Sequence, residues 1–274
     1  MTTANSAAPN PLAMPLTWDL VASAYAEEIV PMFERYAEAA LERAGVQSGS
    51  RVIDVATGPG TLAVLAAQRG ASVDALDFSP KMLHALRARV ERLGLKQINV
   101  LEGDGMALPF PDQSYDAGFS MFGLFMFADR ARGFSELLRV LRPGARAAVS
   151  SWQPFDRAPM LQAVFVALKE ALPDLPFGET KPPLGDRDEF AAEMTAAGFR
   201  DVEVVELMHH LPAPSTDEFF ASLERTFAPI ALVRHKLGDG WKPLGQKLRN
   251  RLVEVAGNGP HEVAMPAWLG VGRR

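Results

Sequence analysis

Short apolar runs alternate with amphipathic stretches through the middle of the chain. The runs suited to buried strands lie at 51–55, 72–76, 98–102, 115–121 and 145–151, and most of them are separated by segments with the 3.6-residue spacing of helices. Ser79 and Pro80 suit the start of one such helix, because serine is a favoured N-cap residue and proline fits the first helical turn. This alternation with short links predicts a parallel sheet with helices on both faces.

The two ends of the chain depart from this alternation. We expect a flexible tail at 1–16, and a core at 17–152 that begins with helical sequence broken or kinked at Pro31. An insertion at 153–187 precedes a core helix and strand at 188–208. A second insertion at 209–260 contains two amphipathic segments, about 217–237 and 243–256, and a last strand lies within 261–274. The insertions are too long for plain connections, so we expect them to form a cap at the edge of the sheet where ligands bind.

Composition narrows the class of protein. The 274 residues are 48% hydrophobic and 22% charged, with a net charge of −5 and no cysteine. The balance is typical of a globular domain, the negative charge disfavours a nucleic-acid partner, and disulfides and thiolate metal sites are excluded. The first 15 residues do not resemble a signal peptide, and the most apolar window, Phe119–Phe127, is about half the length of a membrane span. We therefore expect a cytoplasmic protein with a small-molecule substrate; its oligomeric state stays open.

The candidate ligand-binding residues begin at a glycine-rich turn between the first predicted strand and the helix that follows it. Gly58 and Gly60, with Ala63, fit the dinucleotide-binding fingerprint, and Asp77 lies at about the right distance to bind a ribose. Two further carboxylates favour a different ligand. Asp54, just before the turn, would repel a pyrophosphate and attract a cation, and Asp104 is placed to accept a hydrogen bond from an exocyclic amine. The pattern therefore favours a cationic adenosyl ligand over a nicotinamide dinucleotide.

Several ordered blocks resemble a known family. They are Asp54-Val-Ala-Thr-Gly-Pro-Gly60, Leu76-Asp-Phe-Ser-Pro-Lys-Met82, Glu102-Gly-Asp-Gly-Met-Ala-Leu-Pro-Phe-Pro-Asp112 and Glu136-Leu-Leu-Arg-Val-Leu-Arg-Pro-Gly144. Over about 52–152 the chain resembles class I S-adenosylmethionine-dependent methyltransferases of the ubiquinone/menaquinone-biosynthesis type. The resemblance implies a Rossmann-like, doubly wound, mostly parallel seven-stranded sheet with an antiparallel last strand and a helical cap. Ala56 departs from the pattern, since many members have glycine there.

The resemblance also implies roles for individual residues. Ala56, Gly58 and Gly60 would pass beside the methionine part of S-adenosylmethionine, and Asp54 would help to neutralise its ammonium. Asp77 would accept from both ribose hydroxyls. The remaining expected cofactor contacts are Phe78 and Met82 beside the adenine, Asp104 with the Gly105 or Met106 amide at its polar edge, Ser120 and Met121 near the reactive methyl, and Tyr25 over the methionine end.

Some candidate residues have a purely structural interpretation beside the functional one. The run Phe119–Phe127 suits core packing as well as an adaptable apolar substrate pocket. His209 and His210, expected just beyond the sixth strand, are candidates for a general base, although a solvent-facing pair at a strand end is the favoured interpretation. The five histidines include no metal-binding pattern, so no metal is expected.

The sequence indicates only the chemical class of the molecule that would accept the methyl group. The fourth strand ends in Phe119-Ser-Met-Phe122 and lacks the Asn/Asp-Pro-Pro-aromatic segment of enzymes that methylate amino groups on nucleobases or amides. This favours C- or O-methylation of a small, fairly apolar metabolite. Two alternatives stay open: an NAD(P)-dependent oxidoreductase of Rossmann type, although no Tyr-x-x-x-Lys pair supports it, and a non-catalytic adenosyl-binding module.

Overall fold

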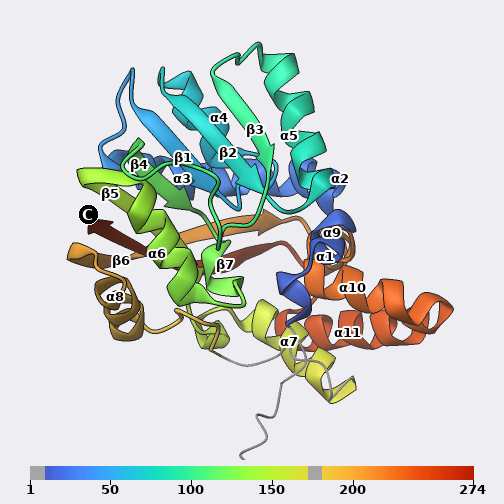
Figure 1. Ribbon diagram of the computed structural model, residues 1–274. Helices are drawn as coiled ribbons and strands as arrows, with labels where there is room; N and C mark the ends of the chain where they lie inside the picture. Colours follow the sequence, from blue (N-terminus) through green and yellow to red (C-terminus); the bar gives the residue numbers. More distant parts are fainter. Residues whose placement is uncertain (1–9, 172–180) are drawn as a thin grey trace, which may run out of the picture.

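A single seven-stranded sheet organises the computed structural model, which describes residues 10–171 and 181–274 (Figure 1). The strand order is β3-β2-β1-β4-β5-β7-β6. β1 to β5 pair in parallel, and β7 lies antiparallel between β5 and β6. The strands are β1 (Arg51–Val55), β2 (Ser72–Asp77), β3 (Ile98–Glu102), β4 (Tyr115–Ser120), β5 (Leu141–Trp152), β6 (Arg200–Ala213) and β7 (His261–Arg273). The expected mostly parallel sheet with an antiparallel last strand is confirmed.

Helices cover both faces of the sheet. α3 (Val30–Ala44), α4 (Thr61–Gln68) and α5 (Pro80–Leu93) share one apolar core with Val52 and other residues of that face. α6 (Arg130–Val140) and α8 (Arg187–Ala196) share another core with Ile53, the next residue along β1. Neighbouring strand residues point to opposite faces, so Val52 and Ile53 of β1 are both buried and apolar because both faces of the sheet are covered. Within the described residues, no helix is both long enough and apolar enough to cross a bilayer.

Four helices form a cap beyond one end of β5, β6 and β7, at the lower right of Figure 1. They are α7 (Pro159–Ala171), α9 (Thr216–Thr226), α10 (Ala228–Leu237) and α11 (Trp241–Ala256), and they share an apolar core of their own. The sequence predicted one helix over about 217–237, but the chain breaks at Phe227 because Pro229 starts a new helix. Helix α7 was not predicted, and residues 172–180 of the expected insertion lie outside the described part.

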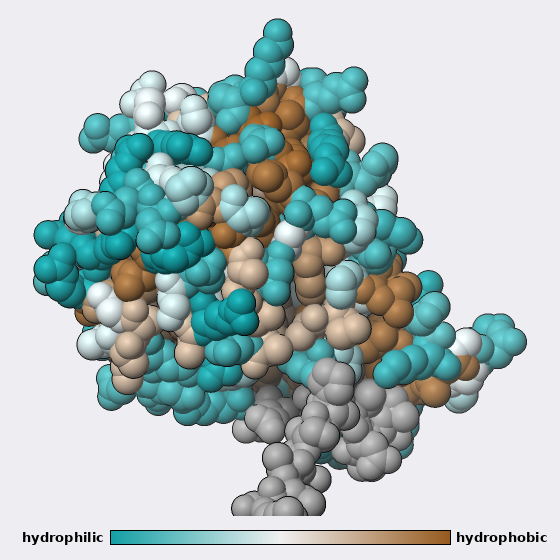
Figure 2. All heavy atoms as spheres, in the orientation of Figure 1, coloured by the Kyte–Doolittle hydropathy of each residue, from teal (hydrophilic) through white to brown (hydrophobic). Residues whose placement is uncertain are grey.

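The cap begins later than predicted because β6 is longer than the sequence indicated. β6 continues pairing with β7 as far as Ala213, opposite His261. His209 and His210, expected beyond the strand end, therefore lie within β6 and pair with Met265 and Ala264 of β7. On the face shown in Figure 2, most surface residues are hydrophilic, and apolar residues gather over β2 and β3 and again near α10.

An N-terminal strap, residues 10–29, crosses the edge of the sheet. It consists of η1 (Pro11–Ala13), α1 (Pro15–Asp19), α2 (Ala22–Ala24) and the π-helical turn η2 (Tyr25–Ile29). Residues 10–16, expected as part of a loose tail, are ordered because the Thr17 hydroxyl and the Trp18 indole donate to the carbonyls of Pro11 and Leu12 at 2.6 and 2.9 Å. Near Pro31, where two helices or a kink were predicted, the π-helical turn η2 passes directly into α3 at Val30.

Two carboxylates hold the strap, Asp19 near its middle and Glu28 near its end. Asp19 Oδ1 accepts from Ser79 Oγ at 2.6 Å and from the Lys81 amide at 3.2 Å, which joins the strap to the start of α5. Glu28 accepts from Ser222 Oγ at 2.7 Å and from Arg225 Nε at 2.6 Å, which joins it to α9 of the cap. The strap therefore spans from the core to the cap, over the carboxyl ends of the central strands.

Candidate functional site

The turn after β1 brings the backbone close to a cavity. Ala56, Gly58 and Gly60 have positive φ angles of 57°, 55° and 77°, which fold the chain sharply from β1 into α4. Gly60 also permits close packing, because a Cβ there would lie 2.2 Å from Leu86 Cδ1 on α5. Ala56 adopts the left-handed conformation at a cost, since its Cβ makes this region unfavourable.

Asp54 lies buried at the base of this turn. Its Oδ2 accepts from Thr57 Oγ1 at 2.6 Å. Burial raises the pKa of Asp54 to about 7, and the charge of Asp77 raises it further, although the bonds from Thr57 and the Ala63 amide oppose this rise. A carboxyl in such a place is ready to receive a cation that would stabilise its ionised form.

Asp77, at the end of β2, joins two turns. Its Oδ2 accepts from the Gly58 amide and its Oδ1 from the Ser79 amide, both at 2.8 Å. Ser79 in turn N-caps α5 by accepting from the Met82 amide at 3.2 Å, as predicted. Burial raises the pKa of Asp77 to about 6, although the backbone amides of Ser79, Gly58 and Phe78 oppose this rise. A carboxylate offers about four lone-pair sites, so the group retains capacity to accept further hydrogen bonds.

Asp104 lies beyond the end of β3, at the rim of the cavity. Its Oδ1 accepts from the Met106 amide at 2.8 Å, and its side chain is exposed. Gly105 follows beneath the Phe127 ring, where an added Cβ would lie 2.5 Å from the ring. Only glycine lets the loop pass so close to that ring.

The turn after β4 forms the opposite wall. Ser120 Oγ accepts from the Leu124 amide at 3.0 Å, and Ser150 Oγ from the Phe122 amide at 2.8 Å. These bonds hold the 121–127 segment, in which Phe122 has a φ of 55°. Gly123 faces the turn after β1, because a Cβ on it would lie 2.4 Å from Ala56 Cβ. The two turns are thus in near contact.

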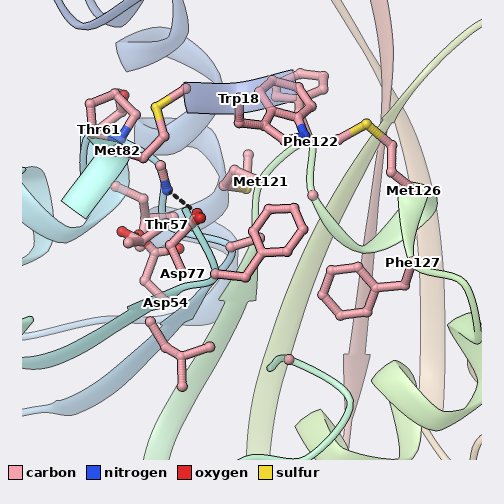
Figure 3. Close-up of a pocket in the computed structure, with 18 of the residues that line it drawn as sticks. Trp18, Asp54, Thr57, Thr61, Asp77, Met82, Met121, Phe122, Met126 and Phe127 are labelled. Carbon is pink, nitrogen blue, oxygen red and sulfur yellow. Dashed lines mark hydrogen bonds between the residues drawn. The ribbon is translucent and has the colours of Figure 1, made fainter. Parts of the chain in front are cut away.

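These elements enclose a cavity of about 360 Å³. Figure 3 shows Asp54, Asp77 and Thr57 gathered together, with Trp18, Phe122, Met126 and Phe127 around the remaining space. The lining contains three carboxylates, and none of its residues is lysine, arginine or histidine. The lining residues are Leu12, Ala13, Trp18, Tyr25, Phe33, Ala37, Asp54, Ala56, Thr57, Gly58, Pro59, Thr61, Leu62, Leu76, Asp77, Phe78, Met82, Gly103, Asp104, Gly105, Met106, Met121, Phe122, Gly123, Met126, Phe127 and Ala128.

Most of the residues singled out from the sequence meet in this cavity. Those that line it are Tyr25, Asp54, Ala56, Gly58, Asp77, Phe78, Met82, Asp104, Gly105, Met106 and Met121. Gly60 and Ser120 do not line it: Gly60 packs on Leu86, and Ser120 holds the loop behind the wall. The two turns therefore shape the cavity through these residues without exposing them to it.

The two candidate histidines lie elsewhere. Neither His209 nor His210 lines the cavity. The His209 ring packs edge-on against Tyr36, with ring centres 4.5 Å apart, and its Nε2 is buried without a hydrogen-bond partner among the described residues. Burial lowers the pKa of His209, and nearby Arg35 and His210 lower it further, which favours the neutral ring.

Sequence reasoning missed much of the apolar wall. Leu12 and Ala13 were assigned to a loose tail, and Trp18 and Phe33 were not distinguished from ordinary helix residues. The only available signal was the clustering of aromatic residues at Trp18, Tyr25 and Phe33. Such spacing is equally common on a helix face that packs into a core.

Comparisons with known proteins agree with this site. A family profile described as a methyltransferase domain matches residues 52–144. A demethylmenaquinone methyltransferase of Clavibacter sepedonicus is 31% identical over 168 residues, which is 57% of this chain and 68% of the relative. The chain belongs to the class I S-adenosylmethionine-dependent methyltransferases, of the ubiquinone/menaquinone-biosynthesis type.

Other relatives agree mainly over the core. A demethylmenaquinone methyltransferase of Thermus thermophilus is 41% identical over 122 residues, 44% of this chain and 55% of the relative. This methyltransferase-family chain spans about half the length of such curated relatives. The solved structure of the [4+2]-cyclase SpnF has a TM-score of 0.61 and 19% identity, and covers 97% of both chains. At that identity the likeness concerns the fold alone.

The near contact between Ala56 and Gly123 yields a prediction for stability. Gly123→Ala should lower the free energy of unfolding by about 1–3 kcal/mol, because its new methyl would overlap that of Ala56. Ala56→Gly should raise it by about 1 kcal/mol by removing the left-handed alanine. In the double variant, the cost of Gly123→Ala should be smaller. Urea unfolding of the four proteins measures the coupling; strictly additive effects would show that the two turns do not touch.

Proposed function

We propose that this protein transfers the methyl group of S-adenosylmethionine to a carbon or oxygen atom of a small, fairly apolar acceptor. The observation that carries the proposal is the charge of the cavity: three carboxylates and no cationic side chain, beside an apolar wall. A ligand with ammonium and sulfonium groups complements that charge. A dinucleotide would place its pyrophosphate against Asp54 and Asp77, which is unfavourable.

The free hydrogen-bonding capacity of the carboxylates fits an adenosyl ligand. Asp77 retains capacity to accept further hydrogen bonds, which two ribose hydroxyls would use. Asp54 would face the ammonium, with Ala56 and Gly58 beside the methionine chain. Asp104 is exposed at the rim and would accept from the adenine amine.

The adenine would lie between Phe78 and Met82, which line the cavity. The Met106 amide is already bonded to Asp104, so the Gly105 amide is the better donor to a ring nitrogen. Tyr25 and Met121 would lie toward the methionine and methyl end. Ser120 would act through the 121–124 loop that it holds, because its hydroxyl is occupied with the Leu124 amide.

The bound cofactor supplies the electrophilic methyl group, so the chain has to bind, orient and exclude water. The ionisable groups in the lining are Asp54, Asp77, Asp104 and Tyr25. The pKa of Tyr25 is raised by burial and by the charge of Asp77, so its phenol stays neutral. With no histidine in the lining, we infer that the acceptor ionises readily without a dedicated base. The demethylmenaquinone methyltransferases among the relatives favour a phenol- or quinol-like acceptor.

Titration calorimetry and a methyl-transfer assay test the proposal. S-adenosylmethionine should bind and NAD should not, and a radiolabelled methyl group should appear on a quinol or phenol acceptor but not on an aliphatic amine. Preferential binding of NAD would overturn the proposal. Tight binding of S-adenosylmethionine with no transfer to any member of a broad acceptor panel would indicate a non-catalytic adenosyl-binding protein.

Asp77→Ala should weaken S-adenosylmethionine binding at least about tenfold, which is about 1.4 kcal/mol, through loss of the ribose bonds. Because Asp77 also holds the Gly58 and Ser79 amides, Ser79→Ala serves as a matched control. It removes the N-cap of α5 and the bond to Asp19 but leaves the Asp77 carboxylate in place. Calorimetry that found equal losses in the two variants would assign the effect to loosening of the turn.

Binding should weaken as the pH falls from about 7.5 to 5.5. The raised pKa values of Asp54, about 7, and Asp77, about 6, mean that both carboxyls gain protons across this range in the free protein. A ligand cation favours their ionised forms, so binding near pH 6.5 should release protons. Calorimetry in buffers of different ionisation enthalpy measures this release. Asp54→Asn should reduce it, and an unchanged release would place the titrating group elsewhere.

A further inference from the structure

Four aromatic side chains form a continuous wall of the cavity. Trp18 and Tyr25 meet edge to face with ring centres 6.3 Å apart, and Tyr25 meets Phe33 in the same way at 5.9 Å. Phe33 then stacks on Phe122 at 4.9 Å. All four line the cavity, although they come from the strap, from α3 and from the turn after β4.

The wall is held in place from behind. Tyr36 and Trp152 contact both Phe33 and Phe122, and the Tyr36 hydroxyl donates to the Met265 carbonyl at 2.5 Å. Phe33 and Phe122 therefore have little freedom to turn away from the cavity. A fixed ring face carries the negative end of its quadrupole and attracts a cation.

The charges around the wall indicate what it faces. Tyr25 lies close enough to Asp77 for that carboxylate to raise its pKa, so the wall adjoins the carboxylate cluster. No positive side chain in the lining competes for the ring faces. A cation held in this cavity would be stabilised by aromatic faces as well as by carboxylates, in surroundings that exclude most water.

The methyl donor and its product differ in one charge. S-adenosylmethionine has a positive sulfonium, whereas S-adenosylhomocysteine has a neutral thioether, and the ammonium, ribose and adenine are common to both. The contacts expected from Asp54, Asp77 and Asp104 are therefore shared by donor and product. Selection between them has to come from another part of the cavity.

We propose that the wall of Trp18, Tyr25, Phe33 and Phe122 selects the cationic methyl donor over its neutral product through cation–π attraction. This inference rests on the proposed function. It assigns to the wall a role in cofactor exchange after each turnover, because a product that the wall does not attract leaves more easily.

Phe33→Leu tests the wall, since leucine keeps the site apolar and removes the ring face. Calorimetry should find S-adenosylmethionine bound about fivefold more weakly than by the unaltered protein, equivalent to about 1 kcal/mol, with S-adenosylhomocysteine changed less than about twofold. Sinefungin, which carries an amine in place of the sulfonium, should follow S-adenosylmethionine. Phe165→Leu is the matched control, because Phe165 belongs to an aromatic cluster of the cap with Phe155 and Phe227 and does not line the cavity.

The outcomes separate the inference from the proposed function. If the unaltered protein binds neither adenosyl compound, the proposed function fails and the inference with it. If both compounds bind but Phe33→Leu weakens them equally, or weakens neither, the methyltransferase proposal stands and the wall is only an apolar surface. Should Phe33→Leu fail to fold, Tyr25→Leu is measured in the same way, with the same selective loss expected.

Discussion

The carboxylate of Asp77 holds together the parts from which the site is built. One oxygen fixes the turn after β1 through the Gly58 amide, and the other fixes the start of α5 through the Ser79 amide. The Ser79 hydroxyl then donates to Asp19 and so secures the strap. Asp77 thus links the turn after β1 directly to the start of α5, and through Ser79 it links both to the strap. The floor and the cover of the cavity depend on the same group that would bind the ligand.

The strap links the core to the cap through hydrogen bonds at two of its residues. Asp19 joins the strap to α5, and Glu28 joins it to Ser222 and Arg225 of α9. Trp18, next to Asp19, and Tyr25, between Asp19 and Glu28, both line the cavity. A change in the cap that shifts α9 therefore reaches the aromatic wall directly. This arrangement suits an enzyme whose acceptor must meet the methyl donor in a closed space.

The sequence predicted the core of the site well because its signals are local. A strand followed by a glycine-rich turn fixes the position of Asp54, and a strand end followed by Ser79-Pro80 fixes that of Asp77, without knowledge of the rest of the chain. The length of β6 was underestimated because its outer half, around His209 and His210, owes its strand structure to pairing with β7. Such pairing depends on a segment about fifty residues away, and single-sequence periodicity does not report it.

Part of the aromatic wall escaped prediction for a related reason. Trp18 and Phe33 come from separate elements, and each alone has the pattern of a residue that packs into a core. Only the crossing of the strap over the sheet brings them to one cavity. The same crossing explains why residues near the N-terminus, which composition assigned to a loose tail, line the site.

Ionising the buried carboxyls of the cavity lowers the stability of the folded protein, and a bound cation can offset this loss. In the folded state Asp54 and Asp77 have raised pKa values, so the folded protein binds more protons near neutral pH than the unfolded chain. Their contribution to stability therefore falls as the pH rises through about 6 to 7, where both carboxyls are forced to ionise in a buried place. A bound cation reverses that penalty by pairing with the ionised forms. The burial of these two carboxylates thus lowers the stability of the folded protein at neutral pH, and it also favours a positively charged methyl donor over an anionic nucleotide.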